Sequence, residues 1–129
     1  MRVLSVASEI FPYVKVGGLG DVMAALPKAL RRLGVDVRVM LPGYPVLLEA
    51  LPGLQPVKAH ADLMQAGPAR VLLGETEDGV PICLLDHPGL FAEEAGPYDD
   101  WDRAHRRFAA LSWAAADLAR EGDGQGWKA

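Results

Sequence analysis

The chain has 129 residues, of which 50% are apolar and 23% charged. This is the size of one domain and the composition of a soluble globular protein, so disorder of the whole chain is excluded. The net charge of -4 argues against a nucleic-acid-binding module, which needs a basic excess. No apolar run reaches the ~20 residues of a membrane helix. We expect neither nucleic acid nor membrane as a partner, and a cytoplasmic location.

The first third of the chain predicts a strand, a helix and a second strand. The valine-rich residues 2–7 are typical of a strand covered on both faces. From Asp21 to Leu33 apolar residues recur every three or four positions, which predicts a helix, and residues 36–41 predict the next strand. This order forms a right-handed βαβ unit with parallel strands. Pro27 interrupts the helical pattern, so either the helix kinks there or a new helix begins there.

The middle of the chain predicts antiparallel strands. A helical turn is expected at 46–51, and three short β-like runs follow it at 57–64, 69–76 and 80–86. Asp78-Gly79 is a tight-turn signal between the last two runs, so we expect an antiparallel hairpin. The predicted fold class is therefore α/β, a Rossmann-like, doubly wound and mostly parallel sheet with an antiparallel hairpin.

The end of the chain predicts a long helix with no strand after it. Residues 87–100 are expected to be a loop, and Asp99 or Asp100 to cap a helix that ends near Glu121. A crossover helix in an α/β fold normally leads to another parallel strand. Residues 1–129 are therefore interpreted as a single incomplete domain, with Trp127 packing against whatever follows. The open sheet edge and the unsatisfied helix face predict self-association of the isolated chain.

The stretch Lys15-Val16-Gly17-Gly18-Leu19-Gly20-Asp21 carries the clearest chemical signal, because it lies between the first strand and the first helix. Ligands of open α/β sheets bind outside the carboxyl ends of the strands. Paired glycines allow close approach of an anion, and the helix N-terminus adds free N–H groups. The stretch suits a phosphate or diphosphate, with Lys15 supplying a full charge. A plain tight turn with a solvated lysine fits it about equally well.

A dinucleotide site is disfavoured by the details of the same stretch. The third small residue of the fingerprint is replaced by Met23, and the glycines come about ten residues after the strand. Asp36 precedes the second strand, whereas the ribose-binding acid of that fingerprint follows it. A nicotinamide or flavin site is therefore a minor alternative.

The remaining reactive side chains predict no further site. The spacing of His60, His87 and His105 is not typical of a metal site, so no metal is expected. Asp86 and His87 are interpreted as surface polarity. Cys83, the only cysteine, lies among apolar residues and is interpreted as a buried structural thiol.

The opening 45 residues closely resemble the N-terminus of bacterial glycogen synthases and plant starch synthases. The shared motifs are Ala7-Ser8-Glu9, Phe11-Pro12, Lys15-Val16-Gly17-Gly18-Leu19, Asp21-Val22 and Leu26-Pro27-Lys28-Ala29-Leu30. Val16 stands where the family has threonine, and Gly20 where it has alanine. The match weakens through the middle and returns at Tyr98-Asp99 and Arg107–Ser112.

The resemblance implies a specific function and fold. These enzymes move glucose from a nucleotide sugar, here ADP-glucose rather than UDP-glucose, to the non-reducing end of an α-1,4-glucan, with retention of configuration. Their fold is GT-B, two Rossmann-like domains facing a cleft, and this chain would be the first part of the N-terminal domain. No cofactor beyond the donor substrate is implied.

The resemblance also implies site residues. Lys15, Gly17 and Gly18 would bind the sugar nucleotide, Asp21 would contact the donor or hold the loop, and Tyr98 would face the cleft. For Asp21 a helix cap, and for Tyr98 an ordinary loop position, stay open. The family's histidine-containing segment and its second domain have no counterpart in these residues, so the chain alone is expected to be inactive. The alternative is a stand-alone, non-catalytic module that binds a sugar, a glucan or a partner protein.

Overall fold

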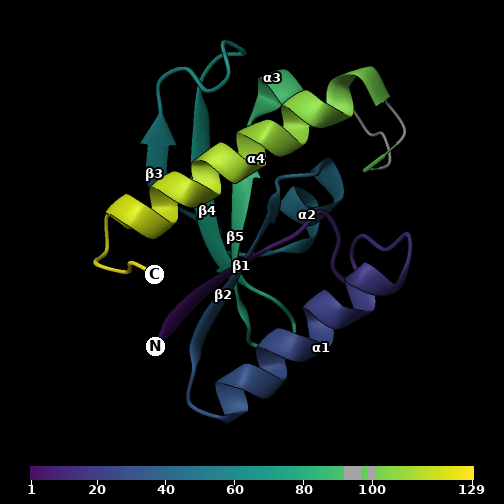
Figure 1. Cartoon of the computed structure of the whole chain (residues 1–129), viewed down its shortest axis with the longest axis vertical. Helices are drawn as coiled ribbons and strands as arrows, with labels where there is room; N and C mark the ends of the chain where they lie inside the picture. The colour runs from purple at the N-terminus through teal and green to yellow at the C-terminus, as the bar shows by residue number, and fades with distance from the viewer. Residues whose placement is uncertain (92–96, 99–100) are drawn as a thin grey trace.

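The computed structural model describes residues 1–91, 97–98 and 101–129 (Figure 1). In chain order its elements are β1 (Arg2–Val6), α1 (Gly18–Arg32), β2 (Asp36–Pro42), α2 (Pro45–Ala50), β3 (Gln55–His60), β4 (Ala69–Glu75), β5 (Pro81–Asp86), α3 (Pro88–Phe91) and α4 (Trp101–Glu121). The predicted elements are confirmed, with several differences. β1 lies at the edge of the sheet and its residues are exposed or half-buried, so it is not covered on both faces as expected, and β3 spans residues 55–60 rather than 57–64. The first helix begins at Gly18, because the glycines form its first turn, and a short helix, α3, occupies part of the expected loop. Asp99 and Asp100, the expected caps, lie outside the described residues.

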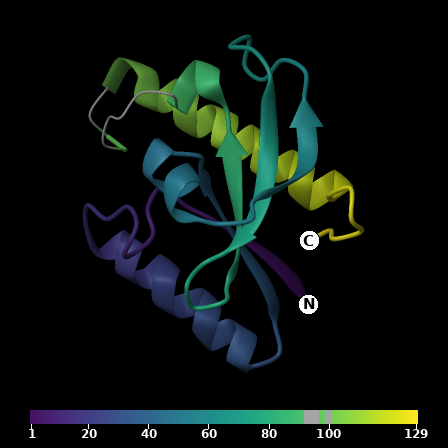
Figure 2. The ribbon, with the colours of Figure 1, turned by 180° about the vertical axis from the view of Figure 1, so that it is seen from behind.

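Within these residues the five strands form one mixed sheet in the order β1-β2-β5-β4-β3. β1 pairs with β2 and β2 with β5 in parallel, whereas β4 pairs with β5 and β3 in antiparallel fashion. The βαβ unit and the hairpin are therefore as predicted. β3 joins through an antiparallel pairing, as the alternative of three antiparallel strands in the middle of the chain allowed, so the sheet is mixed rather than mostly parallel. The antiparallel strands lie at the opposite side of the sheet from β1 (Figure 2).

Helices cover both faces of the sheet, which is the doubly wound arrangement. Successive residues of a strand point to opposite faces. Ser5 and its register partner Val39 point to the face of α1, where the Ser5 hydroxyl contacts Met23 Sδ at 3.7 Å. Arg38, one residue before Val39, points to the other face and pairs with Asp123, just after α4. The centre of the sheet is therefore buried from both sides.

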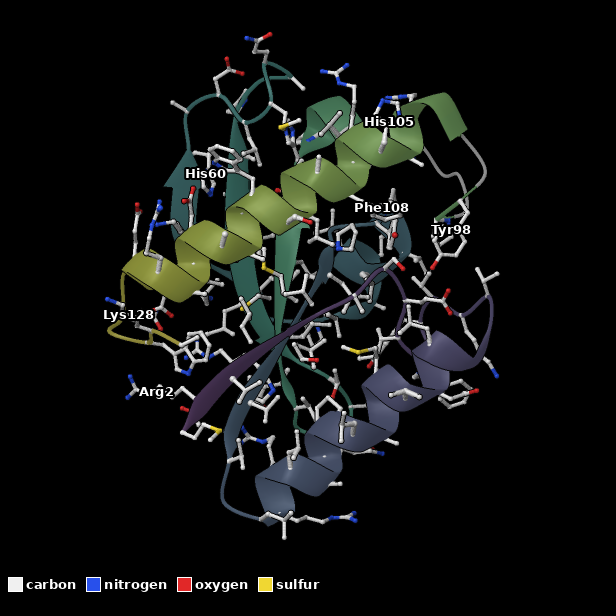
Figure 3. All side chains as sticks on the ribbon, viewed as in Figure 1. Arg2, His60, Tyr98, His105, Phe108 and Lys128 are labelled. Atoms are coloured by element: carbon white, nitrogen blue, oxygen red, sulfur yellow. The ribbon has the colours of Figure 1, made fainter. Side chains whose placement is uncertain are left out.

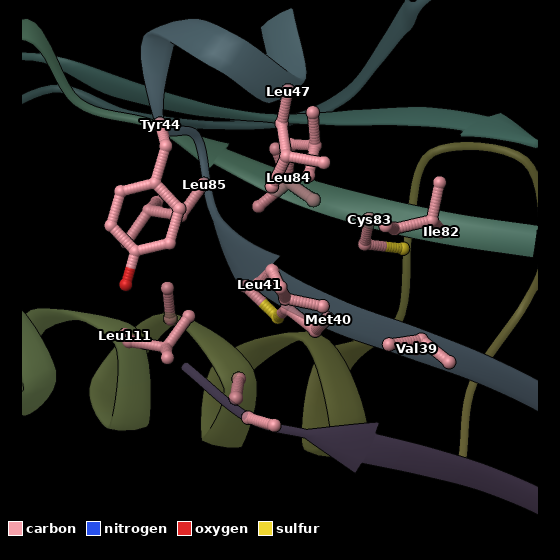
Figure 4. Packing of buried hydrophobic residues seen from close by; sticks show 14 of the residues in the cluster. Val39, Met40, Leu41, Tyr44, Leu47, Ile82, Cys83, Leu84, Leu85 and Leu111 are labelled. Carbon is pink, nitrogen blue, oxygen red and sulfur yellow. The ribbon is translucent and has the colours of Figure 1, made fainter. Parts of the chain in front are cut away.

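The core is centred on β2 and β5. Val39, Met40 and Leu41 of β2 are fully buried, as is the run Ile82–Leu85 of β5 (Figure 4). This accounts for the continuous apolar run in each strand. Cys83 belongs to this core, and burial raises the pKa of its thiol to about 11, so the prediction of a structural cysteine is confirmed.

Helix α1 is continuous through Pro27, so no new helix begins there. Proline has no N–H to donate to Met23, so one helical hydrogen bond is missing there. Pro27 is itself buried against the sheet. Burial of the ring offsets the lost hydrogen bond, which is why the helix continues.

The residues after α4 fold back onto the start of β2, contrary to the expectation for Trp127. Its side chain is 5% exposed, its indole N–H donates to Asp36 at 3.1 Å, and the Arg38 guanidinium lies 4.4 Å from its ring centre. The Asp123 carboxylate has no exposed area and lies 2.9 Å from Arg38. It also accepts the backbone N–H groups of Gln125 and Trp127. Burial opposes ionisation of Asp123, yet these hydrogen bonds leave its pKa below the usual range.

We predict that Asp123→Ala lowers the free energy of unfolding of this chain by about 3 kcal/mol, because it leaves the Arg38 charge without its buried partner. The measurement is urea denaturation at pH 7. Asp78→Ala is the matched control, since the Lys28–Asp78 pair has the same type of contact at 3.0 Å but is exposed. It should cost less than about 1 kcal/mol. Equal losses in the two variants would contradict the prediction.

Candidate functional site

The candidate site is the loop that joins β1 to α1, together with Tyr98. The loop leaves the sheet at the carboxyl end of β1, the edge at which α/β proteins bind ligands. A small antiparallel bridge between Ile10 and Val14 closes its first half. Tyr98 and Phe108 lie beside this loop, near the start of α1 (Figure 3). The sheet edge, the helix start and the segment before α4 therefore meet at one place.

Glu9 is the centre of this loop, and it is the functional candidate that sequence analysis missed. Its side chain is buried, at 3% exposure, although it carries a carboxylate. The oxygen Oε1 accepts the backbone N–H groups of Val16 and Gly17, each at 3.1 Å, and of Gly20 at 3.2 Å. These donors belong to the glycine-rich stretch and the first turn of α1. A side chain of the protein thus fills part of the anion site that the glycines predict.

The second carboxylate oxygen of Glu9 connects the loop to Tyr98. The Tyr98 hydroxyl donates to Oε2 at 2.7 Å and lies 2.6 Å from the Ser8 hydroxyl. Because the single phenolic proton goes to the carboxylate, the Ser8 hydroxyl must donate to Tyr98. The Gly17 N–H, the Tyr98 hydroxyl and the other backbone donors together lower the pKa of Glu9. Burial raises the pKa of Tyr98, so the tyrosine keeps its proton.

Lys15 and Asp21 form an ion pair at the outer side of the loop. Lys15 Nζ lies 3.0 Å from an Asp21 carboxylate oxygen, and 43% and 55% of the two side chains are exposed. The Phe11 ring lies 5.8 Å from the same ammonium group. Exposed pairs of this kind contribute only about 0–1 kcal/mol, so Lys15 can turn to another anion at small cost. Asp21 lies in the first turn of α1, after the N-cap residue Gly17, and is not the cap.

The glycines at 17 and 18 are not required by the packing of this chain. A Cβ atom at Gly17 or Gly18 would meet no atom within 4 Å, and neither residue has a positive φ. Gly20 differs, since a Cβ there would lie 3.3 Å from Glu9 Oε1 and from Lys15 Cγ. The outer surface of the loop is open at the paired glycines, where their backbone can be approached from outside.

The five residues proposed from sequence lie in or beside the loop that joins β1 to α1, and two of them bind Glu9 directly. Lys15 pairs directly with Asp21, while Gly17 and Tyr98 both bind Glu9. The available signal for Glu9 was its place, a charged residue shortly after the first strand and before a glycine-rich loop.

The other titratable candidates lie elsewhere. His87 is fully buried, with Nε2 2.9 Å from the Leu63 carbonyl oxygen, so its interpretation as surface polarity is wrong. It follows β5 directly, and α3 and the loop at Leu63 enclose it. No group of three metal-ligating side chains occurs in the described part of the chain. No described helix is long and apolar enough to cross a membrane.

Comparison with known proteins agrees with the motifs around this site. The family model described as the starch synthase catalytic domain matches residues 2–129. The chain belongs to this family. It is 49% identical to a glycogen synthase of Cereibacter sphaeroides over 98% of its own length, and 47% identical to glycogen synthase 1 of Rhizobium meliloti over 99%. It spans about 27% of the length of each of these relatives.

A solved structure of the starch synthase family has the same fold. The catalytic domain of starch synthase IV from Arabidopsis thaliana, bound to ADP and acarbose, matches with a TM-score of 0.67 and 33% identity. The match covers 93% of this chain and 25% of that one. The α/β, Rossmann-like arrangement expected from the sequence, as part of a starch synthase catalytic domain of the GT-B class, is confirmed.

The lowered pKa of Glu9 predicts how stability depends on pH. Its folded-state pKa lies below the ordinary value of 4.5, so its contribution is fully present above pH 4.5 and is lost as pH falls through the folded-state pKa. Glu9→Gln should be less stable than the wild-type chain at pH 7, and the difference should shrink in acid. Urea denaturation at a series of pH values between 7 and 3 measures this. Glu49→Gln, on the exposed side of α2, is the control and should run parallel to the wild type.

Proposed function

We propose that this chain is the N-terminal part of a glycogen synthase-type retaining glucosyltransferase. The enzyme would move glucose from ADP-glucose to the non-reducing end of an α-1,4-glucan. Membership of the starch synthase catalytic domain family supports the reaction class. The starch synthase IV structure holds ADP and acarbose, which supports a nucleotide and a glucan as ligands. The share of 27% of its relatives supports the interpretation of residues 1–129 as one incomplete domain.

The observation that carries the site is the open surface of Gly17 and Gly18 beside Lys15. The fold itself does not demand glycine at these two positions, so a ligand that must approach the backbone closely explains them. The N–H groups of Gly18 and Leu19 belong to the first helical turn, where no carbonyl of the helix can accept them. No side chain in the described part of the chain accepts them either. Together with Lys15 they suit a phosphate of the donor.

The other partners follow from the same proposal. Asp21 holds Lys15 beside the glycines in the free protein and contacts the donor or the loop when the donor is bound. Tyr98, whose ring is partly exposed, faces the cleft. A cytoplasmic location and self-association of the isolated chain stay predictions. A stand-alone binding module is the contrary outcome of the first experiment below.

The complete natural gene product should have a mass several times that of the 129-residue chain and should transfer glucose from ADP-glucose to glycogen. In that product, Lys15→Ala should lower kcat/KM for ADP-glucose at least about tenfold, because a charge-assisted contact to phosphate is lost. Lys28→Ala is the matched control, since Lys28, on α1, also pairs with an aspartate at 3.0 Å. A natural product of only 129 residues would refute the enzyme, and unchanged donor kinetics in Lys15→Ala would refute the role of Lys15.

Gly18→Ala separates function from stability. Because the added Cβ meets no atom of the protein, the free energy of unfolding of the variant should equal that of the wild type or exceed it by up to ~1 kcal/mol. Any gain comes from the higher helix propensity of alanine. In the complete product the same methyl group should raise the KM for ADP-glucose at least about tenfold, because it stands where the phosphate approaches. Denaturation and donor kinetics on the same variant measure both. A destabilised chain, or an unchanged KM, would mean that the glycine serves only the fold.

A further inference from the structure

Four hydrogen-bond donors, from three separate parts of the sequence, bind the one buried carboxylate of Glu9. Glu9 lies shortly after β1. Its donors are Val16 and Gly17 of the glycine-rich loop, Gly20 of the first turn of α1, and Tyr98 of the segment before α4. A buried carboxylate is costly unless donors surround it, and each of these donors is within 3.2 Å. The arrangement is thus a cluster built around one charge rather than a chance contact.

The position of Glu9 divides the donors of the loop into two sets. The N–H groups of Val16, Gly17 and Gly20 are bound to Oε1 from the inner side. The N–H groups of Gly18 and Leu19 lie between them in the first turn of α1, on the residues where the loop is open. An internal anion therefore holds the frame of the loop, and the remaining donors are left for an external one.

We infer that Glu9 is a positioning residue for the donor. It fixes the glycine-rich loop in the form that offers Gly18, Leu19 and Lys15 to a phosphate, and it ties this loop to Tyr98. The identity of the donor in this inference rests on the proposed function. The hydrogen bonds around Glu9 do not depend on it. Glu9 does not itself bind the phosphate, because two negative charges would repel each other in the same buried space.

For this role, the charge and the hydrogen-bonding groups of the Glu9 side chain matter more than its volume. Glutamine has the same shape and can accept N–H groups, but it is neutral and its amide nitrogen cannot accept the Tyr98 hydroxyl proton. Aspartate keeps the charge but is one methylene shorter, so it cannot reach the loop and Tyr98 together. Tyr98→Phe removes the hydroxyl that donates to Glu9 and keeps the aromatic ring against Phe108. All three variants should therefore loosen the loop without emptying the core.

The experiment compares Glu9→Gln with Asp123→Asn in the complete gene product. Both residues are buried carboxylates that accept backbone N–H groups, but Asp123 lies at the opposite end of β2 from the loop. Glu9→Gln should raise the KM for ADP-glucose and the Kd of ADP by calorimetry at least about tenfold, and speed amide exchange at Val16, Gly17 and Gly20. Asp123→Asn should change stability but keep the KM, the Kd and these exchange rates within about twofold of the wild type.

The outcomes distinguish the two proposals. An active enzyme in which Glu9→Gln leaves donor KM and ADP affinity unchanged overturns the positioning role and leaves the proposed function intact. If Asp123→Asn raises the donor KM as much as Glu9→Gln does, the positioning role is also overturned, since a general loss of stability then explains both increases. If the wild-type product binds ADP but transfers no glucose, the proposed function fails, and the Kd of Glu9→Gln still decides the role of Glu9. A wild-type product that binds no ADP overturns both.

Discussion

The hydrogen bonds between the Glu9 carboxylate and the glycine-rich loop are the interaction on which the site depends. A helix N-terminus has backbone donors without partners, and a buried carboxylate needs several donors to stay ionised. Here the backbone donors and the carboxylate satisfy each other, since the Gly17 and Gly20 N–H groups donate to the same Glu9 oxygen. The strand end, the loop and the start of α1 therefore hold together through one side chain. Tyr98 extends this connection to the segment before α4.

The charges near the loop limit what this part of the protein can do alone. Among the described residues of the loop and the first turn of α1, Lys15 is one cation, and Glu9 and Asp21 are two anions, so their balance is -1 before any ligand arrives. A diphosphate adds further negative charge, and oriented N–H dipoles offset only part of it. Under the proposed function, further cations must come from outside these residues. This chain spans about 27% of the length of its glycogen synthase relatives.

The sequence could predict what depends on neighbouring residues and not what depends on distant ones. Apolar periodicity located the strands and helices, and Asp78-Gly79 located the hairpin, because these signals are local. Tyr98 for Glu9, Leu63 for His87 and Asp36 for Trp127 are partners from distant parts of the sequence, so these contacts were missed. Pro27 shows the same limit in a helix. Its local effect is unfavourable, and only its packing against the sheet explains why α1 continues.

The glycines of this chain differ in whether packing requires them. Gly43 follows β2, and a Cβ atom there would lie 2.7 Å from the Leu85 carbonyl oxygen, so packing alone demands glycine. Gly17 and Gly18 face open space and have no such demand. Gly17 serves the fold as the N-cap of α1, a position that favours glycine, whereas Gly18 costs chain entropy in the first helical turn. Under the proposed function, close approach of the donor to the backbone is the reason for glycine at position 18. The same comparison separates Glu9, whose partners are all internal, from Lys15, whose exposed pair with Asp21 leaves it able to turn outward.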